Sequence, residues 1–198
     1  MKKYIKILIP LSTTLIPISI VGCTKHNEEG SGSFPKEWLQ INGDYLVGFK
    51  PEHDTQKELA GYSVLTIPKE VSNLQNGAFS YDGSADKDGP LVIKKIDFEK
   101  DTLCRVFGQA SFSGCANLTT VVFPPLFQGT DPNLFQRCSK LTTLDFTNVT
   151  VDLARPGSLI SNIGISPTGQ IIIKGDRLLD AVSQIKHKLG EGWTIVQK

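Results

Sequence analysis

The sequence has no run of basic residues and no excess of either charge. Its 198 residues include 21 Lys and Arg against 20 Asp and Glu, for a formal net charge of +1. Proteins that bind nucleic acids cluster Lys and Arg to neutralise phosphates. We therefore expect no nucleic acid partner.

Motifs that would indicate a common enzyme class are also missing. The chain has no Gly-x-Ser-x-Gly, no phosphate-cradling Gly-Lys-Ser/Thr loop and no Gly-x-Gly-x-x-Gly. A Cys or Ser nucleophile needs a nearby base, yet His26, His53 and His187 fall far from the repeat positions described below. A glycosidase that uses Asp97 and Asp145 as its paired carboxylates is an alternative, although a solvated surface role is favoured for both residues. We expect a protein that is not an enzyme and that needs no cofactor.

Cysteine is scarce, with four in the chain, and none forms a Cys-x-x-Cys pair. Structural zinc sites need four ligands, usually in paired spacing. The sequence therefore predicts no metal site.

The one long apolar stretch lies at the N-terminus, after Lys2 and Lys3. It runs from Ile5 to Val21 and is broken by Pro10 and Pro17, so it is too short and interrupted to persist as a membrane-spanning helix. It ends in Ile-Val-Gly-Cys at residues 20–23, which resembles a bacterial lipobox. That resemblance implies cleavage before Cys23 and acylation of its thiol, with palmitate among the chains. An uncleaved N-terminal anchor is the alternative.

Residues 24–33 contain no apolar side chain and end in Gly and Ser, which predicts a flexible tether. Glu28 and Glu29 resemble the acidic export signal of some surface-exposed lipoproteins, although a solvated linker would look the same. Removal of residues 1–22 takes away three lysines and changes the formal net charge from +1 to −2.

Short strands recur along the rest of the chain. Five segments place two apolar residues on either side of one position, which is the alternation of a strand with one inward face. The segments are Leu65–Ile67, Ile96–Phe98, Val121–Phe123, Leu144–Phe146 and Ile171–Ile173, and they follow one another at similar intervals. Such even spacing predicts a solenoid with one strand per coil.

A second element recurs between the strands. Phe112, Cys115 and Leu118 are matched by Phe135, Cys138 and Leu141 at one constant offset along the chain. Cys115 and Cys138 should therefore stack one coil apart, where a disulfide is geometrically conceivable. Packing of both as small core residues is the favoured interpretation.

Together these patterns resemble the BspA-like leucine-rich repeats of bacterial surface antigens. The segment from Leu65 to Phe79 follows that pattern, and the closing Gly192-Trp193 occupies the place expected at the end of such an array. The similarity extends over residues 61–196. It departs in the polar insertion at residues 81–90 and again at residues 151–168.

The predicted fold is an α/β-type leucine-rich-repeat solenoid, mostly β, with a short parallel sheet. We expect a lipoprotein signal peptide (1–22), a tether (23–33), an N-terminal cap hairpin (34–60) with an Asn42-Gly43 turn, repeats (61–174) and a C-terminal cap (175–198). In that cap, Leu178, Val182, Ile185 and Leu189 form one helical stripe, which Asp176 could cap at its start and Gly190 at its end.

The outward strand positions are the predicted binding face. They mix both charges and hydroxyls with the apolar Val122 and Ile172, which suits protein recognition, although an ordinary sheet surface would look similar. The face comprises Lys95, Asp97, Glu99, Thr120, Val122, Thr143, Asp145, Thr147, Gln170, Ile172 and Lys174. The insertion at residues 81–90 is a second candidate.

The resemblance and the lipobox imply an adhesin or protein-interaction module, anchored in the cell envelope and expected on the outer membrane surface. Its partner would be a protein of a host or a neighbouring cell. An envelope scaffold is the rival, and a glycan-binding protein is a third possibility that the lack of aromatics on the predicted face disfavours.

Overall fold

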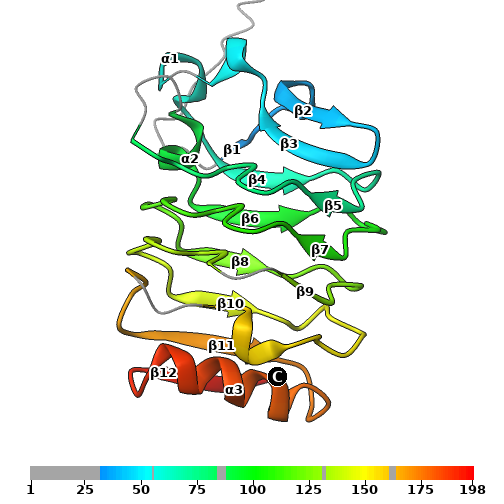
Figure 1. Ribbon diagram of the computed structural model, residues 1–198, viewed down its shortest axis with the longest axis vertical. Coiled ribbons are helices and arrows are strands. Elements are labelled where there is room, and N and C mark those ends of the chain that lie inside the picture. Colours follow the sequence, from blue (N-terminus) through cyan, green and yellow to red (C-terminus); the bar gives the residue numbers. More distant parts are fainter. Residues whose placement is uncertain (1–31, 55, 84–87, 131–132, 161–163) are drawn as a thin grey trace, which may run out of the picture.

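The computed structural model describes residues 32–54, 56–83, 88–130, 133–160 and 164–198, in which the chain winds into a stack of coils (Figure 1). The predicted leader, Cys23 and the tether as far as residue 31 lie outside the described residues. So does part of the polar insertion, at residues 84–87.

A seven-stranded sheet, here called sheet A, runs along the whole stack. All of its neighbouring pairs are parallel, with one strand for each coil, as the sequence predicts. Its strands in spatial order are β1 (Gly32–Ser33), β4 (Tyr62–Ile67), β6 (Lys95–Phe98), β8 (Thr120–Val122), β10 (Thr143–Asp145), β11 (Gly169–Ile173) and β12 (Trp193–Gln197). Gly32 and Ser33, predicted as tether, pair instead with β4, so that part of the prediction is wrong.

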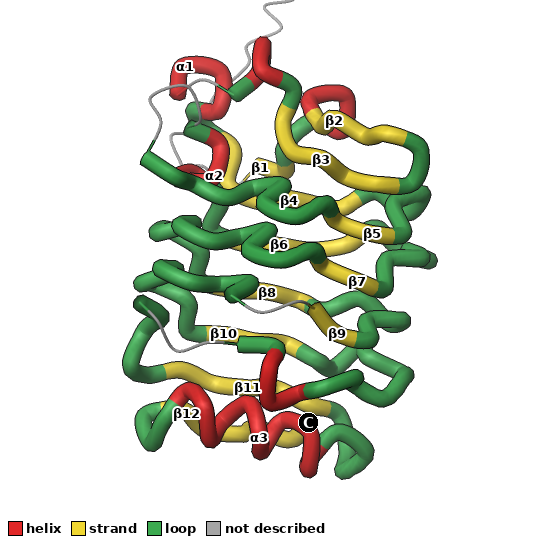
Figure 2. The backbone as a smooth tube through the Cα atoms, in the orientation of Figure 1, coloured by secondary structure: helices red, strands yellow, loops and turns green. Residues whose placement is uncertain are grey.

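A second sheet, sheet B, lies on the other side of the coils (Figure 2). It consists of β2 (Leu39–Asn42), β3 (Tyr45–Phe49), β5 (Asn73–Leu74), β7 (Val106–Phe107) and β9 (Gly129–Thr130). The sequence did not predict the last three, because two residues are too few to show alternation. β2 and β3 form the predicted antiparallel hairpin, turning at Gly43 with φ of +64°, and β3 pairs with β5. The hairpin thus closes the stack by extending sheet B.

Helical segments are short except for the last. They are η1 (Lys36–Trp38), η2 (Pro51–His53), α1 (Gln56–Leu59), α2 (Gly89–Val92), η3 (Pro156–Ser158) and α3 (Leu179–Leu189). Val182, Ile185 and Leu189 of α3 are buried, as the stripe predicts. The Asp176 side chain does not cap α3; it accepts a hydrogen bond from Gln197 Nε2 at 2.6 Å instead. No helix among the described residues is long and apolar enough to cross a membrane.

Two columns of phenylalanine rings stack through the core. In one, Phe79, Phe112 and Phe135 stack with ring centroids 5.6 and 5.9 Å apart. In the other, Phe123 stacks on Phe146 at 4.1 Å and on Phe107 at 6.0 Å. Each column joins rings from successive coils, so the coils share one continuous core.

Phe98, Phe123 and Phe146 end three successive predicted strand segments, but their rings do not form one continuous column. Phe98 is half-buried and stacks at 5.7 Å on Phe107, which lies between it and Phe123. Phe107 belongs to sheet B, so its insertion into the column could not be read from the sheet A pattern alone.

The described cysteines are core residues. Cys104, Cys115 and Cys138 are free and buried, which confirms the favoured interpretation over a disulfide. Cys115 Sγ donates to Phe79 O at 3.3 Å and Cys138 Sγ donates to Phe112 O at 3.1 Å, so the recurrent thiol links each coil to the one before. Burial raises the pKa of Cys115 and raises the pKa of Cys104 to about 12. Both thiols are therefore protonated at neutral pH and unsuited to act as nucleophiles.

Candidate interaction surface

Sheet A presents two regular columns of side chains on its outer face, because its strands pair in parallel without shifts from β4 to β12. One column contains Val64, Lys95, Thr120, Thr143, Gln170 and Thr194, and the other contains Thr66, Asp97, Val122, Asp145, Ile172 and Val196. The predicted face is therefore brought together on one surface. The first column is polar apart from Val64. In the second column, carboxylates alternate with branched aliphatic side chains from Asp97 to Ile172.

The carboxylates of this face are held by local partners. Lys95 Nζ donates to Asp97 Oδ2 at 2.6 Å, and the Phe98 N–H donates to Asp97 Oδ1 at 2.9 Å. Asp145 Oδ1 accepts from the hydroxyl and the backbone N–H of Thr147, at 2.6 and 2.9 Å. These bonds fix the orientation of both carboxylates, which leaves fewer rotamers to be lost when a partner binds.

Val122 separates the two carboxylates, because β8 lies between β6 and β10. A pair of carboxylates that performs glycoside hydrolysis must instead face one scissile bond from its two sides. The arrangement suits a binding surface better than a hydrolytic site. The described residues also include no group of three or more His, Cys, Asp and Glu that could hold a metal ion.

Ile172 corrects the predicted composition of the face. It points away from the core but is only 7% exposed, because Asp145 and Val196 flank it from the neighbouring strands. Val122, which is half-buried, is the apolar member of the predicted face that a partner can reach.

Three predicted residues lie just past their strands rather than within them. Glu99 follows β6, Thr147 follows β10 and Lys174 follows β11, so all three belong to the turns at the carboxyl edge of sheet A. Glu99 Oε2 accepts a hydrogen bond from the backbone N–H of Lys69 at 3.0 Å, which joins two adjacent turns.

A cleft of about 470 Å³ opens at this carboxyl edge. The turns after β6 and β8 form its walls, and Asp97, Glu99 and Val122 of the predicted face line it together with Leu103 and Leu126. Leu103 is 55% exposed. The outer face therefore continues into a hollow that combines carboxylates with apolar side chains.

The cleft arises from a local departure from the repeat. The segment 99–105, which separates Phe98 from β7, is longer than the segment 124–128, which separates Phe123 from β9. The longer turn includes Asp101 in the left-handed region, with φ of +61°. Sequence reasoning missed Leu103, although the interval from Phe98 to Phe123 exceeds that from Phe123 to Phe146 and so pointed to this turn.

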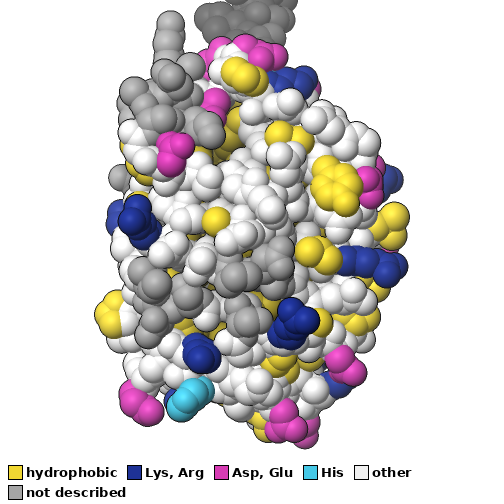
Figure 3. All heavy atoms as spheres, in the orientation of Figure 1, with side chains coloured by type: hydrophobic (Ala, Val, Ile, Leu, Met, Phe, Trp, Pro, Cys, Tyr) yellow, Lys and Arg dark blue, Asp and Glu magenta, His cyan; other side chains and the backbone are white. Residues whose placement is uncertain are grey.

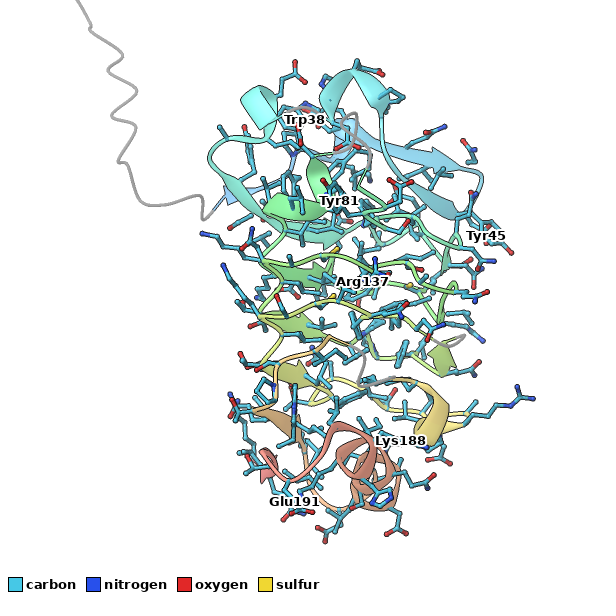
Figure 4. All side chains as sticks on the ribbon, turned by 60° about the vertical axis from the view of Figure 1, so that its left-hand side comes forward. Trp38, Tyr45, Tyr81, Arg137, Lys188 and Glu191 are labelled. Carbon is cyan, nitrogen blue, oxygen red and sulfur yellow. The ribbon has the colours of Figure 1, made fainter. Side chains whose placement is uncertain are left out.

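Sheet B carries a second apolar patch. Tyr45 of β3 is 49% exposed and Val106 of β7 is 39% exposed, and both lie in register with Asn73 of β5. Hydrophobic side chains are visible along that side of the stack (Figure 3), where Tyr45 projects from the edge (Figure 4). This patch was also missed, because two-residue strands give no alternation to follow.

Residues 89–155 match the family model described as the BspA type leucine-rich repeat region. The matched segment runs from α2 through β6, β8 and β10, and so includes the cleft and the centre of the outer face. The chain therefore contains a BspA-like leucine-rich repeat region. No curated protein and no solved structure matches the chain.

Leucine-rich repeats of this type are generally non-enzymatic modules for protein interaction, and proteins that carry them are typically found at the cell surface. In this repeat protein, the matched coils contain the half-exposed Val122 and the exposed Leu103. The family and the surface therefore both indicate an interaction role.

Proposed function

We propose that this repeat protein is a lipid-anchored adhesin that binds a protein of a host or a neighbouring cell through the outer face of sheet A. The observation that carries the proposal is the continuity of that face with the cleft, which places Val122 and Leu103 among oriented polar side chains. Protein interfaces combine an apolar centre with a polar rim in this way.

The proposed division of the chain follows from the same role. Residues 1–22 are a leader that is removed, Cys23 carries the acyl chains, and the residues up to Ser31 form a tether. The folded part comprises the N-terminal hairpin cap, the repeats and a C-terminal cap of α3 and β12. Two or three acyl chains, at about 0.8 kcal/mol per buried methylene, suffice for stable anchoring.

Replacing Cys23 with Ser should abolish both acylation and cleavage, because only a thiol can form the thioether to diacylglycerol. Mass spectrometry of the protein from a lipoprotein-processing bacterium should show a mature species that begins at Cys23 and carries acyl chains. The Cys23→Ser variant should retain residues 1–22 and lack the acyl mass. Cys104→Ala, which removes a different thiol, should leave processing unchanged; an unprocessed wild-type protein would refute the anchor.

An envelope scaffold is the rival function, and protease treatment of intact cells separates the two. An adhesin is digested from the outside, whereas a scaffold that faces inward is protected. Glycan binding has less support. The outward positions of β6, β8, β10 and β11 carry no aromatic residue, and the Tyr62 ring of β4 packs against Phe34 and Trp38 at 5.8 and 5.1 Å.

The binding role is tested with residues 24–198, because every buried core residue of the described structure lies between Phe34 and Trp193. Immobilised protein is screened against purified extracellular matrix and cell-surface proteins. The proposal expects saturable binding to at least one of them. A complete absence of binding, together with protection of the protein on intact cells, would favour the scaffold.

A further inference from the structure

The stack ends at a strand whose outer edge has no neighbouring strand among the described residues. β12 pairs with β11 on one side and is the last strand of sheet A, at the end opposite to the hairpin (Figure 1). Its sequence, Trp-Thr-Ile-Val-Gln, contains no charge and no proline. Exposed edges are commonly protected by charges, prolines or very short strands, so this edge lacks the usual protection.

The hydrogen-bond pattern shows which backbone groups face outward. The Gly169 N–H donates to Gly192 O and the Lys198 N–H donates to Ile173 O, so the even-numbered residues of this segment bond to β11. Parallel pairing alternates along a strand, so residues 193, 195 and 197 direct their backbone groups away from β11. The Trp193 N–H bonds to Gly190 O, which leaves the groups of Ile195 and Gln197 and the carbonyl of Trp193 facing the edge.

The other end of sheet A is built differently. β1 has only two residues, and Phe34 and Pro35 follow it directly. Pro35 has no backbone N–H to donate to an added strand. One end of the stack is thus protected against strand addition and the other is not. The unprotected edge is therefore particular to β12 and is not shared by the other end of sheet A.

We infer that the β12 edge binds β12 of a second copy in antiparallel fashion, about a two-fold axis through Ile195. In that register Ile195 pairs with the partner's Ile195, and the Gln197 N–H donates to the carbonyl of the partner's Trp193. The outward groups at 193, 195 and 197 are symmetric about the centre, which is what an isologous contact requires.

Charge and burial are consistent with this register. Lys198 is exposed and comes opposite the partner's Gly192, beside the partner's Glu191; Glu191 projects at this end of the molecule (Figure 4). The half-exposed Ile195 and Val196 lose solvent contact when the sheet becomes continuous. The dimer therefore joins opposite charges and covers apolar surface.

The two-fold axis places the N-terminal ends of the two copies at opposite ends of the dimer. If the proposed anchor at Cys23 holds, copies on facing membranes could join through β12, giving contact between cells that carry the same protein. This consequence rests on the proposed function, whereas dimerisation of residues 24–198 in solution does not, so the two can fail separately.

A pair of substitutions at Gln197 tests the dimer. Gln197→Pro removes the outward N–H without removing a bond to β11, whereas Gln197→Ala keeps that N–H; both lose the side-chain bond to Asp176. Sedimentation equilibrium should show wild type and Gln197→Ala as dimers, and Gln197→Pro with a dissociation constant raised at least tenfold. A monomeric wild type, or equal association of the two variants, would overturn the proposal.

The register has its own test. Oxidation should link two copies through Ile195→Cys, since the two-fold axis brings this position opposite itself. Thr194→Cys should not link, because its opposite residue is the partner's Val196. Equal cross-linking of the two variants would rule out a two-fold axis at Ile195.

Discussion

Phe123→Ala should lower the free energy of unfolding of residues 24–198 by about 3–5 kcal/mol, the cost of removing a fully buried ring from a core that cannot close around the cavity. Phe123 has no solvent exposure. Its ring lies 4.1 Å from Phe146, 4.7 Å from Phe127 and 6.0 Å from Phe107, measured between centroids. The substitution therefore interrupts the contact between neighbouring coils, and urea denaturation followed by circular dichroism measures the loss.

Phe98→Ala is the matched control. Phe98 occupies the equivalent place in its coil but is half-buried and stacks on Phe107, at 5.7 Å. Because less apolar area is lost, the expected cost is about 1–2 kcal/mol. An equal or larger cost for Phe98→Ala would mean that the column through Phe123 is not the centre of the core.

Trp193→Ala should lower the free energy of unfolding by about 3–5 kcal/mol, because it removes a buried ring from the C-terminal cap. Trp193 is fully buried, and its Nε1 donates to Ser166 O at 3.0 Å. Gly169 on β11 leaves room for the indole: a Cβ there would lie 2.7 Å from Trp193 Cη2. The ring thus joins β12 to the last repeat coil through both packing and a hydrogen bond.

Trp193→Phe separates those two contributions. It keeps an aromatic ring in the site but loses the donor, so the expected cost is about 1–3 kcal/mol, from the unsatisfied Ser166 carbonyl.

Hydrogen exchange should show faster exchange in α3 and β12 of Trp193→Ala than in β6 and β8. Uniform acceleration across all strands would contradict a local capping role.

The inward pattern of sheet A could be predicted because burial selects apolar residues at alternate positions. Leu65, Ile96, Val121, Leu144 and Ile171 are all fully buried. The outward pattern is less informative, since the exposure of a residue depends on its neighbours in adjacent strands. Ile172 occupies an outward position yet is buried by Asp145 and Val196, which belong to other coils and are distant from it in the sequence.

Sheet B could not be predicted for a different reason. The strands β5, β7 and β9 are defined by backbone pairing between coils, and two residues carry no periodic pattern. Arg137 gives a further example. It adopts φ of +63° at the position that Gly114, with φ of +82°, occupies in the preceding coil, so the fold holds a turn there that the residue type does not indicate.

The outer face of sheet A is tested most directly by two identical substitutions on opposite sides of the stack. Val122→Asp places a carboxylate between Asp97 and Asp145, whereas Val106→Asp places one on sheet B, in register with Asn73. Surface plasmon resonance against a protein captured in the screen should show affinity reduced at least thirtyfold by Val122→Asp and less than threefold by Val106→Asp. The reverse order would move the binding site to the sheet B patch and contradict the account.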